Sequence, residues 1–115
     1  MAKKNVGSVV TSGDGILVTG ADVDHLTRLH QAPAGTSHFH VVGIRATNND
    51  TSDRTVTICF AGVEGKDYIT RTIPSKSGLS VVVDAERIWN GAAVYAFASV
   101  ANKITLRVDV DEENA

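Results

Sequence analysis

Along most of this chain, hydrophobic residues recur at every second position, which is the period of a β-strand with one buried face. In the stretch 104–110 (ITLRVDV), the aliphatic residues share one face, and Thr, Arg and Asp share the other. The stretch 55–60 (TVTICF) repeats the pattern, with Val56, Ile58 and Phe60 pointing inward. Strands with one solvated face are typical of antiparallel sheets.

Turn signals separate the alternating segments about every ten residues, as at Gly13-Asp14-Gly15, in the polar run 48–53 and at Asn90-Gly91. The pattern predicts strands at 6–11, 16–19, 25–30, 37–47, 55–60, 68–73, 79–83, 92–100 and 104–110. Only residues 84–88 favour a helical turn. Eight or nine short strands with this spacing predict an all-β fold, an antiparallel β-sandwich of jelly-roll type.

The length of 115 residues suits a single domain that spans 1–115. Residues 31–110 carry the strong alternation and form the predicted compact sandwich, and residues 111–115 form an acidic tail. Residues 1–30 are rich in Gly, Ser, Thr and Asp and alternate weakly. This N-terminal segment is either an extended arm that pairs with a neighbouring subunit or an ordinary hairpin of the same sandwich.

Composition and charge narrow the classes of partner. Aromatic residues make up 5% of the chain, so the core must be built from aliphatic side chains. With a net charge of -2 and a pI near 6.0, the chain lacks the excess of positive charge that is typical of nucleic-acid-binding domains. Cys59 is alone, which excludes an intramolecular disulfide. No apolar run approaches the ~18 residues of a membrane span or forms a signal-peptide core, so we expect a soluble protein made in a cytoplasm.

His38 and His40 lie two positions apart on a predicted strand and therefore share a face. Some double-stranded β-helix enzymes of the cupin type present two metal ligands in this way, but they add a third ligand nearby, and residues 41–44 (VVGI) supply none. His25 and His30 can join the pair only through the fold. If His38 or His40 lies at a subunit contact, protonation near its reference pKa of about 6.5 would weaken that contact.

No catalytic motif accompanies these residues. The chain contains no Gly-x-Ser-x-Gly elbow and no phosphate-binding loop, and Cys59 fits a structural thiol in mid-strand. The sequence therefore predicts no enzyme, no cofactor and no metal, with a small metal-dependent enzyme as the least favoured alternative. Trp89 is either a hot spot for a partner or a plug at one end of the core.

Residues 26–110 carry an ordered set of turn and strand signatures. These are APAGT at 32–36, ATNN at 46–49, the strand 55–60, IPSKSGL at 73–79 followed by VVV at 81–83, WNG at 89–91, AVYAFA at 93–98 and AN at 101–102. The set resembles a group of small proteins from the head modules of tailed phages. The resemblance implies a head decoration (cement) protein, commonly trimeric, that sits on the outer capsid and clamps neighbouring capsid subunits.

The resemblance therefore implies a virion protein on the outer capsid surface, with the major capsid protein as partner and a homotrimer as its oligomeric state. We expect the N-terminal segment to contribute, because its core pattern is weak and its lysines suit an acidic capsid surface. The predicted interface residues are Lys3, Lys4, Val6, Val9, Val10, His38, His40 and Trp89. The alternative is a neck- or tail-associated module that binds a receptor or glycan, for which Trp89, Tyr68 and Tyr95 are the candidate aromatics.

Overall fold

The computed structural model describes residues 3–5, 15–22, 25–32, 34–35, 37–61, 68–76, 78–88 and 90–114. For residues 3–5, 38, 61 and 114 it describes the backbone alone. The strands in these ranges are β1 (Lys3–Asn5), β2 (Ile16–Leu17), β3 (Thr27–Gln31), β4 (His38–Asn48), β5 (Arg54–Ala61), β6 (Tyr68–Ile73), β7 (Ser80–Ile88), β8 (Ala93–Ala98) and β9 (Ile104–Asn114).

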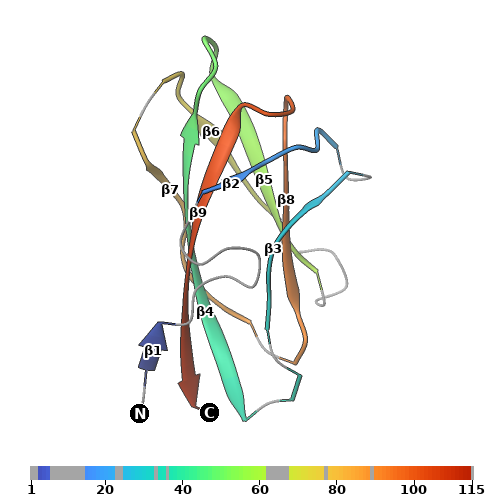
Figure 1. Ribbon diagram of the computed structural model, residues 1–115, viewed down its shortest axis with the longest axis vertical. Coiled ribbons are helices and arrows are strands. Elements are labelled where there is room, and N and C mark those ends of the chain that lie inside the picture. Colours follow the sequence, from blue (N-terminus) through green and yellow to red (C-terminus); the bar gives the residue numbers. More distant parts are fainter. Residues whose placement is uncertain are drawn as a thin grey trace.

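The strands form two sheets that pack face to face (Figure 1). Sheet A has the order β9-β4-β7, and β1 and β2 both pair with the outer edge of β9. Sheet B has the order β3-β8-β5-β6. Every described pairing is antiparallel, and from β2 to β9 the chain crosses to the other sheet after every strand except β5, which pairs with β6; this is the strand order of a jelly roll. The predicted all-β sandwich is confirmed.

The N-terminal strands pair with their own chain. Residues of β1 lie opposite 111–113 of β9, and residues of β2 lie opposite 105–106 of the same strand. Both chain ends therefore lie at the lower end of the molecule, while the turn between β4 and β5 lies at the upper end (Figure 1). The predicted strand at 6–11 falls outside the described residues.

One predicted element is wrong. Residues 84–88 form no helical turn but continue the strand β7 to Ile88. The pairing of β7 with β4 shifts register twice, between Val42 and Ile44 and between Ile44 and Arg45. Such bulges insert unpaired residues and break the strict alternation along the strand. The sequence pattern at 84–88 therefore lost the period of two although the backbone stays extended.

The core between the sheets is aliphatic. Inward residues such as Val42, Ile44, Val56, Ile58 and Leu106 are 0–1% exposed. Among the described residues, one aromatic side chain belongs to the buried cluster, that of Phe60. Of the other described aromatics, Phe39, Tyr95 and Phe97 are half-buried and Tyr68 is exposed.

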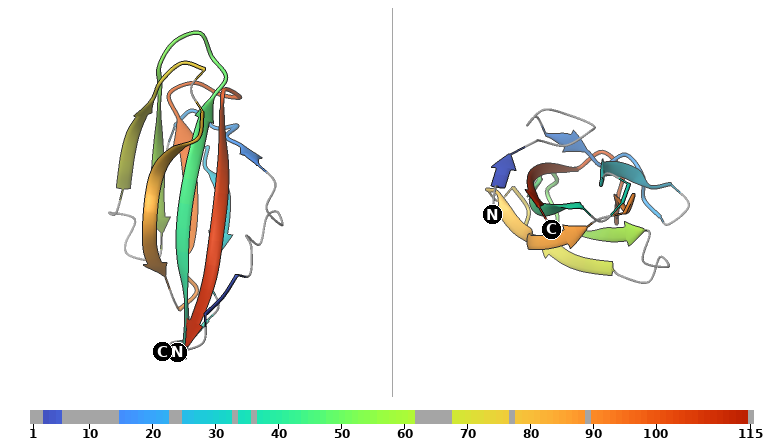
Figure 2. Two further views of the ribbon diagram at one scale, coloured as in Figure 1. Left: turned by 90° about the vertical axis from the view of Figure 1, so that its left-hand side faces the viewer. Right: turned by 90° about the horizontal axis from the view of Figure 1, so that it is seen from below.

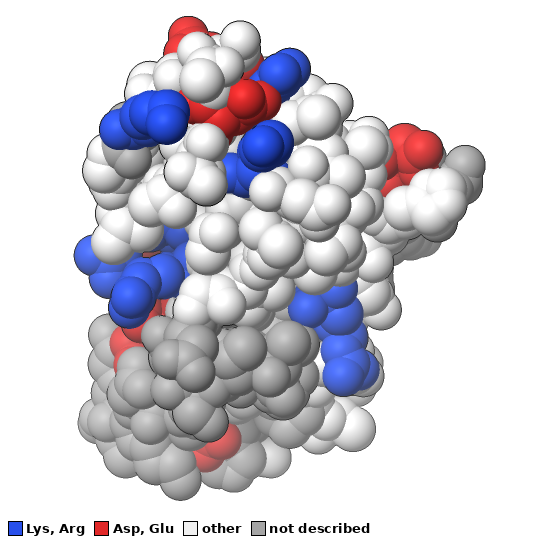
Figure 3. All heavy atoms as spheres, turned by 45° about the horizontal axis from the view of Figure 1, so that its top comes forward, with Lys and Arg blue, Asp and Glu red and all other residues white. Residues whose placement is uncertain are grey.

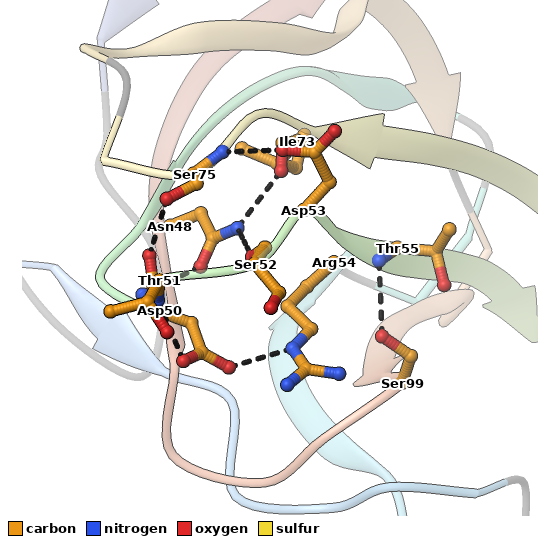
Figure 4. A network of polar contacts seen from close by, with 10 residues as sticks. All are labelled: Asn48, Asp50, Thr51, Ser52, Asp53, Arg54, Thr55, Ile73, Ser75 and Ser99. Atoms are coloured by element: carbon orange, nitrogen blue, oxygen red, sulfur yellow. Dashed lines mark hydrogen bonds and ion pairs between the residues drawn. The ribbon is translucent and has the colours of Figure 1, made fainter.

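A polar network fixes the turn at the upper end (Figure 4). The Asn48 amide, 2% exposed, donates to the carbonyls of Ser52 and Ile73 at 2.9 Å and accepts a bond from the Asp50 amide at 2.8 Å. The Asp50 carboxylate in turn accepts a bond from Arg54 Nε at 2.7 Å, and this bond lowers the pKa of Asp50. The turn is thereby tied to the end of β6, which holds the two sheets in a fixed relation.

Candidate functional site

The outer face of sheet B carries aromatic and hydroxyl side chains and almost no charge. The four strands of this sheet contain no Asp or Glu, whereas the strands of sheet A contain six. Side chains on the outer side of sheet B are those at alternate positions to the buried residues. We call the central group the aromatic face, and it consists of Arg28, Thr57, Cys59, Tyr68, Thr70, Tyr95 and Phe97.

The strand register arranges this face in rows. Cys59 lies opposite Tyr68 on one side and Tyr95 on the other. Adjacent strands are about 4.8 Å apart, so the two tyrosines stand about 10 Å from one another on the sheet. In the next row Thr57 lies opposite Thr70 and Phe97, and the hydroxyls of Thr57 and Thr70 are 3.1 Å apart. Two aromatic rows therefore lie side by side.

Small residues bound these two rows. Thr55 pairs with Thr72 above them, and Ala61 pairs with Ala93 below them. Tyr68 is 51% exposed, and Tyr95 and Phe97 are half-buried. Protein interfaces concentrate aromatics and exclude charge at their centre, with weaker contacts around them. The composition of this face matches that of an interface core.

Cys59 lies in the middle of the aromatic face but is only 4% exposed. Burial raises the pKa of its thiol, because the thiolate would lose its hydration. A buried, protonated thiol is a poor nucleophile and a poor partner for disulfide exchange. Cys59 therefore contributes packing to this face and not reactivity.

The outer face of sheet A is different in kind. It carries charges of both signs, such as the ion pair of Arg45 and Asp109 at 3.2 Å and Arg87 above the Phe39 ring at 4.2 Å. Exposed pairs of this type contribute little stability. The left view of Figure 2 looks onto this sheet. Figure 3, in which the upper end of the molecule comes forward, shows Lys and Arg side chains beside Asp and Glu side chains at that end.

Two of the hollows lined by described residues open on the outer face of sheet A. The larger has a volume of about 680 Å³, and its lining includes the exposed Lys76, Leu79 and Arg107 and the buried Asn48. The smaller, about 250 Å³, surrounds Gly43 and reaches the buried Ile44 and Val83. Ligand sites are concave and mostly apolar, with a few convergent polar groups. No described His or Cys lines either hollow, and we assign no ligand to them.

A buried histidine pair joins the two sheets near the lower end. His30 of β3 is 1% exposed and His40 of β4 is 7% exposed. Nε2 of His30 lies 2.8 Å from Nδ1 of His40, and the rings stack with centroids 5.0 Å apart. Nε2 of His40 lies 3.3 Å from the Glu112 carboxylate on β9. The cluster therefore links three strands across the core.

The proton positions follow from the partners. A carboxylate only accepts, so in the neutral form of His40 its Nε2–H donates to Glu112, and its Nδ1 accepts from Nε2–H of His30. Burial, and then the proximity of His40, lowers the pKa of His30 from 6.5 to about 4. Both imidazoles act within the core, so His40 offers little surface to a neighbouring subunit.

The other predicted interface residues lie in several places. Lys3 and Lys4 lie on β1, opposite Glu113 and Glu112. His38 begins β4, and its side chain is outside the described part of the chain. Val6, Val9, Val10 and Trp89 also fall outside it. In the described residues, no three His, Cys, Asp or Glu side chains form a group that could hold a metal ion, and no helix is long and apolar enough to cross a membrane.

The sequence pattern did not bring Tyr68, Tyr95 and Phe97 together as a group, and it left open whether His25 or His30 joins His40; the fold brings His30 to it. A signal for the first was present, because the outward positions of 55–60, 68–73 and 93–98 carry Thr and aromatics where those of 104–110 carry charges. What was missing was the strand order that makes these segments neighbours. The burial of His30 could not be predicted from alternation, because a bulge between Arg28 and His30 turns two consecutive residues toward the core.

Comparisons with known proteins support the fold. No protein-family model and no curated protein matches the chain. One similar solved structure comes from Bacillus endospore appendages, described as a novel family of disulfide-linked pili. The two chains are 14% identical, the TM-score is 0.52, and the match covers 99% of this chain and 91% of the other. A match of this kind shows a common fold.

Proposed function

We propose that this chain is a structural protein without catalytic activity, which acts by binding neighbouring protein subunits in a larger assembly. The observation that carries this proposal is the aromatic face, which combines the exposed Tyr68 and the half-buried Tyr95 and Phe97 with strands that lack carboxylates. Flat surfaces of this composition bind other proteins, whereas small molecules favour concave sites. The buried, mutually bonded His30 and His40 serve the fold.

The assembly that we propose is the head of a tailed phage, with this chain as a decoration protein on the outer capsid. The support is the ordered set of turn and strand signatures in residues 26–110 described above. A decoration protein needs only modest individual contacts, because several copies bound together act through a high effective concentration. A small aliphatic sandwich with one adhesive face is sufficient for that task.

Particles from a host that carries this gene provide the test. Quantitative mass spectrometry of purified particles should find the chain in hundreds of copies, in fixed ratio to the major capsid protein. Particles made without the chain should release their DNA at a lower temperature. A dozen or fewer copies would place the chain in the neck or tail, and absence from particles would refute the proposal.

A glycan-binding module is the second candidate, and the position of the two tyrosines favours it. Tyr68 and Tyr95 stand about 10 Å apart on one face with hydroxyls of Thr57 and Thr70 beside them. Tyrosine rings offer an apolar face and a polar tip to such ligands. Retention of the chain on an insoluble polysaccharide, lost in Tyr68→Ala and kept in Val81→Ala, would favour this candidate over decoration.

A fibre is a further type of assembly that a jelly roll can build, as the similarity to an endospore appendage illustrates. A continuous disulfide-linked polymer needs two cysteines in each subunit. This chain has one, and it is buried. A fibre of this chain would therefore depend on non-covalent contacts. Electron microscopy of the purified chain should show no fibres if decoration is correct.

A further inference from the structure

The aromatic face is chemically compatible with a second copy of itself. Its central rows contain no carboxylate, and Arg28 at its margin is the one cation in the group defined above. A charged partner surface would lose hydration here without gaining a counter-charge. An uncharged, flat and aromatic partner avoids that loss, and a second aromatic face has this chemistry.

The rows also suit a two-fold contact. In a two-fold pair, residue i of one copy contacts residue j of the other, and j contacts i. An axis between the Thr57 row and the Cys59 row places the row of Tyr68 and Tyr95 over the row of Thr57 and Phe97 of the other copy. Tyr68 then faces the small Thr70 of the other copy, and Tyr95 faces Phe97 as an aromatic pair, while the outer Thr and Ala rows form the rim.

The dimensions of the face suit a weak contact. Sheet B has four strands about 4.8 Å apart, and its longest strand has 8 residues, so the sheet measures about 14 by about 27 Å. This area of about 400 Å² is below the roughly 800 Å² that each partner contributes to a standard interface, and small interfaces of this kind belong to weak pairs. Two sheets that pack face to face bring such areas together at about 10 Å separation.

Two of the sheet edges, β7 and β6, are poorly suited to pairing with another chain, which favours the face over these edges as the route for association. The edge strand β7 contains two register shifts and the exposed charges Asp84, Glu86 and Arg87. On the other edge, Arg71 of β6 occupies an inward position, opposite the buried Val56. Bulges and inward-pointing charges are devices that prevent edge-to-edge pairing.

We infer that the aromatic face of one chain is covered by the aromatic face of a second copy, in a pair with two-fold symmetry. The inference deepens the proposed structural role and rests on it, since it names the first partner that the face binds. This pair differs from the homotrimer that the sequence resemblance implies. When a face binds the identical face of a second copy, both faces are covered and no third chain can join through them.

Sedimentation equilibrium of the purified chain from about 1 µM to about 100 µM tests the inference. We expect the wild-type chain to reach the mass of two chains. Tyr68→Glu and Thr70→Lys each place a charge in the contact and should weaken it at least about tenfold. Val81→Glu makes a matched change on the outer face of sheet A, where Val81 is 60% exposed, and should leave the pair intact.

The fold of each variant is verified by circular dichroism, and Tyr68→Phe, which keeps the ring, should retain the pair. A mass of one chain, or of three chains, across the range would overturn the inference. So would a pair that Val81→Glu disrupts as much as Tyr68→Glu and Thr70→Lys do. The mass spectrometry of particles tests the decoration role separately from the pairing. If the chain is a monomer in solution but is found on particles, only the pairing is refuted. If the chain forms a pair but is absent from particles, only the decoration role is refuted.

Discussion

Acid should weaken this fold through His30, whose buried side chain is held in its neutral form. The pKa of His30 is about 4 in the folded chain and 6.5 in its ordinary environment. The unfolded chain therefore binds the proton first as the pH falls. The stability that follows from a neutral His30 is complete above pH 6.5 and is lost as the pH falls toward 4.

The size of the loss follows from the two pKa values. Each unit of difference is worth about 1.4 kcal/mol, so the complete loss is about 3 kcal/mol. Between about pH 7.5 and about pH 5, protonation of His30 in the unfolded chain lowers the free energy of unfolding by about 2 kcal/mol. Small domains are stable by about 5–15 kcal/mol in total. The lowered pKa of Asp50 acts in the same direction, but below its ordinary value of 3.8 and thus outside this window.

Urea unfolding at about pH 7.5 and about pH 5 measures the effect. The free energy of unfolding of the wild-type chain should fall by about 2 kcal/mol. His30→Gln keeps a side-chain amide near His40 but removes the titrating group, so the stability of this variant should differ little between the two pH values. His25→Gln changes an exposed imidazole, and this variant should show the same pH difference in stability as the wild-type chain. Equal wild-type stability at the two pH values, or an undiminished difference in His30→Gln, would refute the reasoning.

Three further predictions concern single buried side chains. Asn48→Ala removes three hydrogen bonds at the upper end and should cost about 3 kcal/mol in urea unfolding, while Asn49→Ala, at an exposed position, should cost under about 0.5 kcal/mol. Leu106→Ala empties a fully buried site and should cost about 3 kcal/mol, whereas Leu17→Ala, 45% exposed, should cost less than about 1 kcal/mol. Cys59 should react with a thiol reagent far more slowly in the folded chain than in urea, and equal rates would contradict its burial.

The fold was predictable because its main signal is local. Alternation at 68–73 placed β6 at its observed limits, and at 55–60 it placed β5 to within one residue at each end. Where the pattern failed, the cause was a bulge. The register shifts in β7 removed the alternation at 84–88, and the shift in β3 placed Leu29 and His30 together in the core.

The candidate site was less predictable, because it depends on which strands are neighbours. Tyr68 and Tyr95 are 27 positions apart in the sequence and meet across Cys59 only through the order β8-β5-β6. Alternation fixes which side chains share a face within one strand, but it carries no information on strand order. The same limit applies to His30 and His40, which lie in different sheets and meet across the core.

The histidine cluster and the aromatic face share one strand pair, which couples the chemistry of the core to the surface. His30 lies opposite Val94 on β8, and the adjacent outward residues of this pair are Arg28 and Tyr95. A proton on His30 places a charge beside His40 between the sheets and favours any movement of β3 that admits water. Such a movement would displace the margin of the aromatic face before its centre, because Tyr68, Thr70 and Tyr95 all lie on strands that β5 holds. Acid should therefore loosen the contacts that Arg28, on β3, makes with a partner at a pH where the rest of the sandwich is still folded.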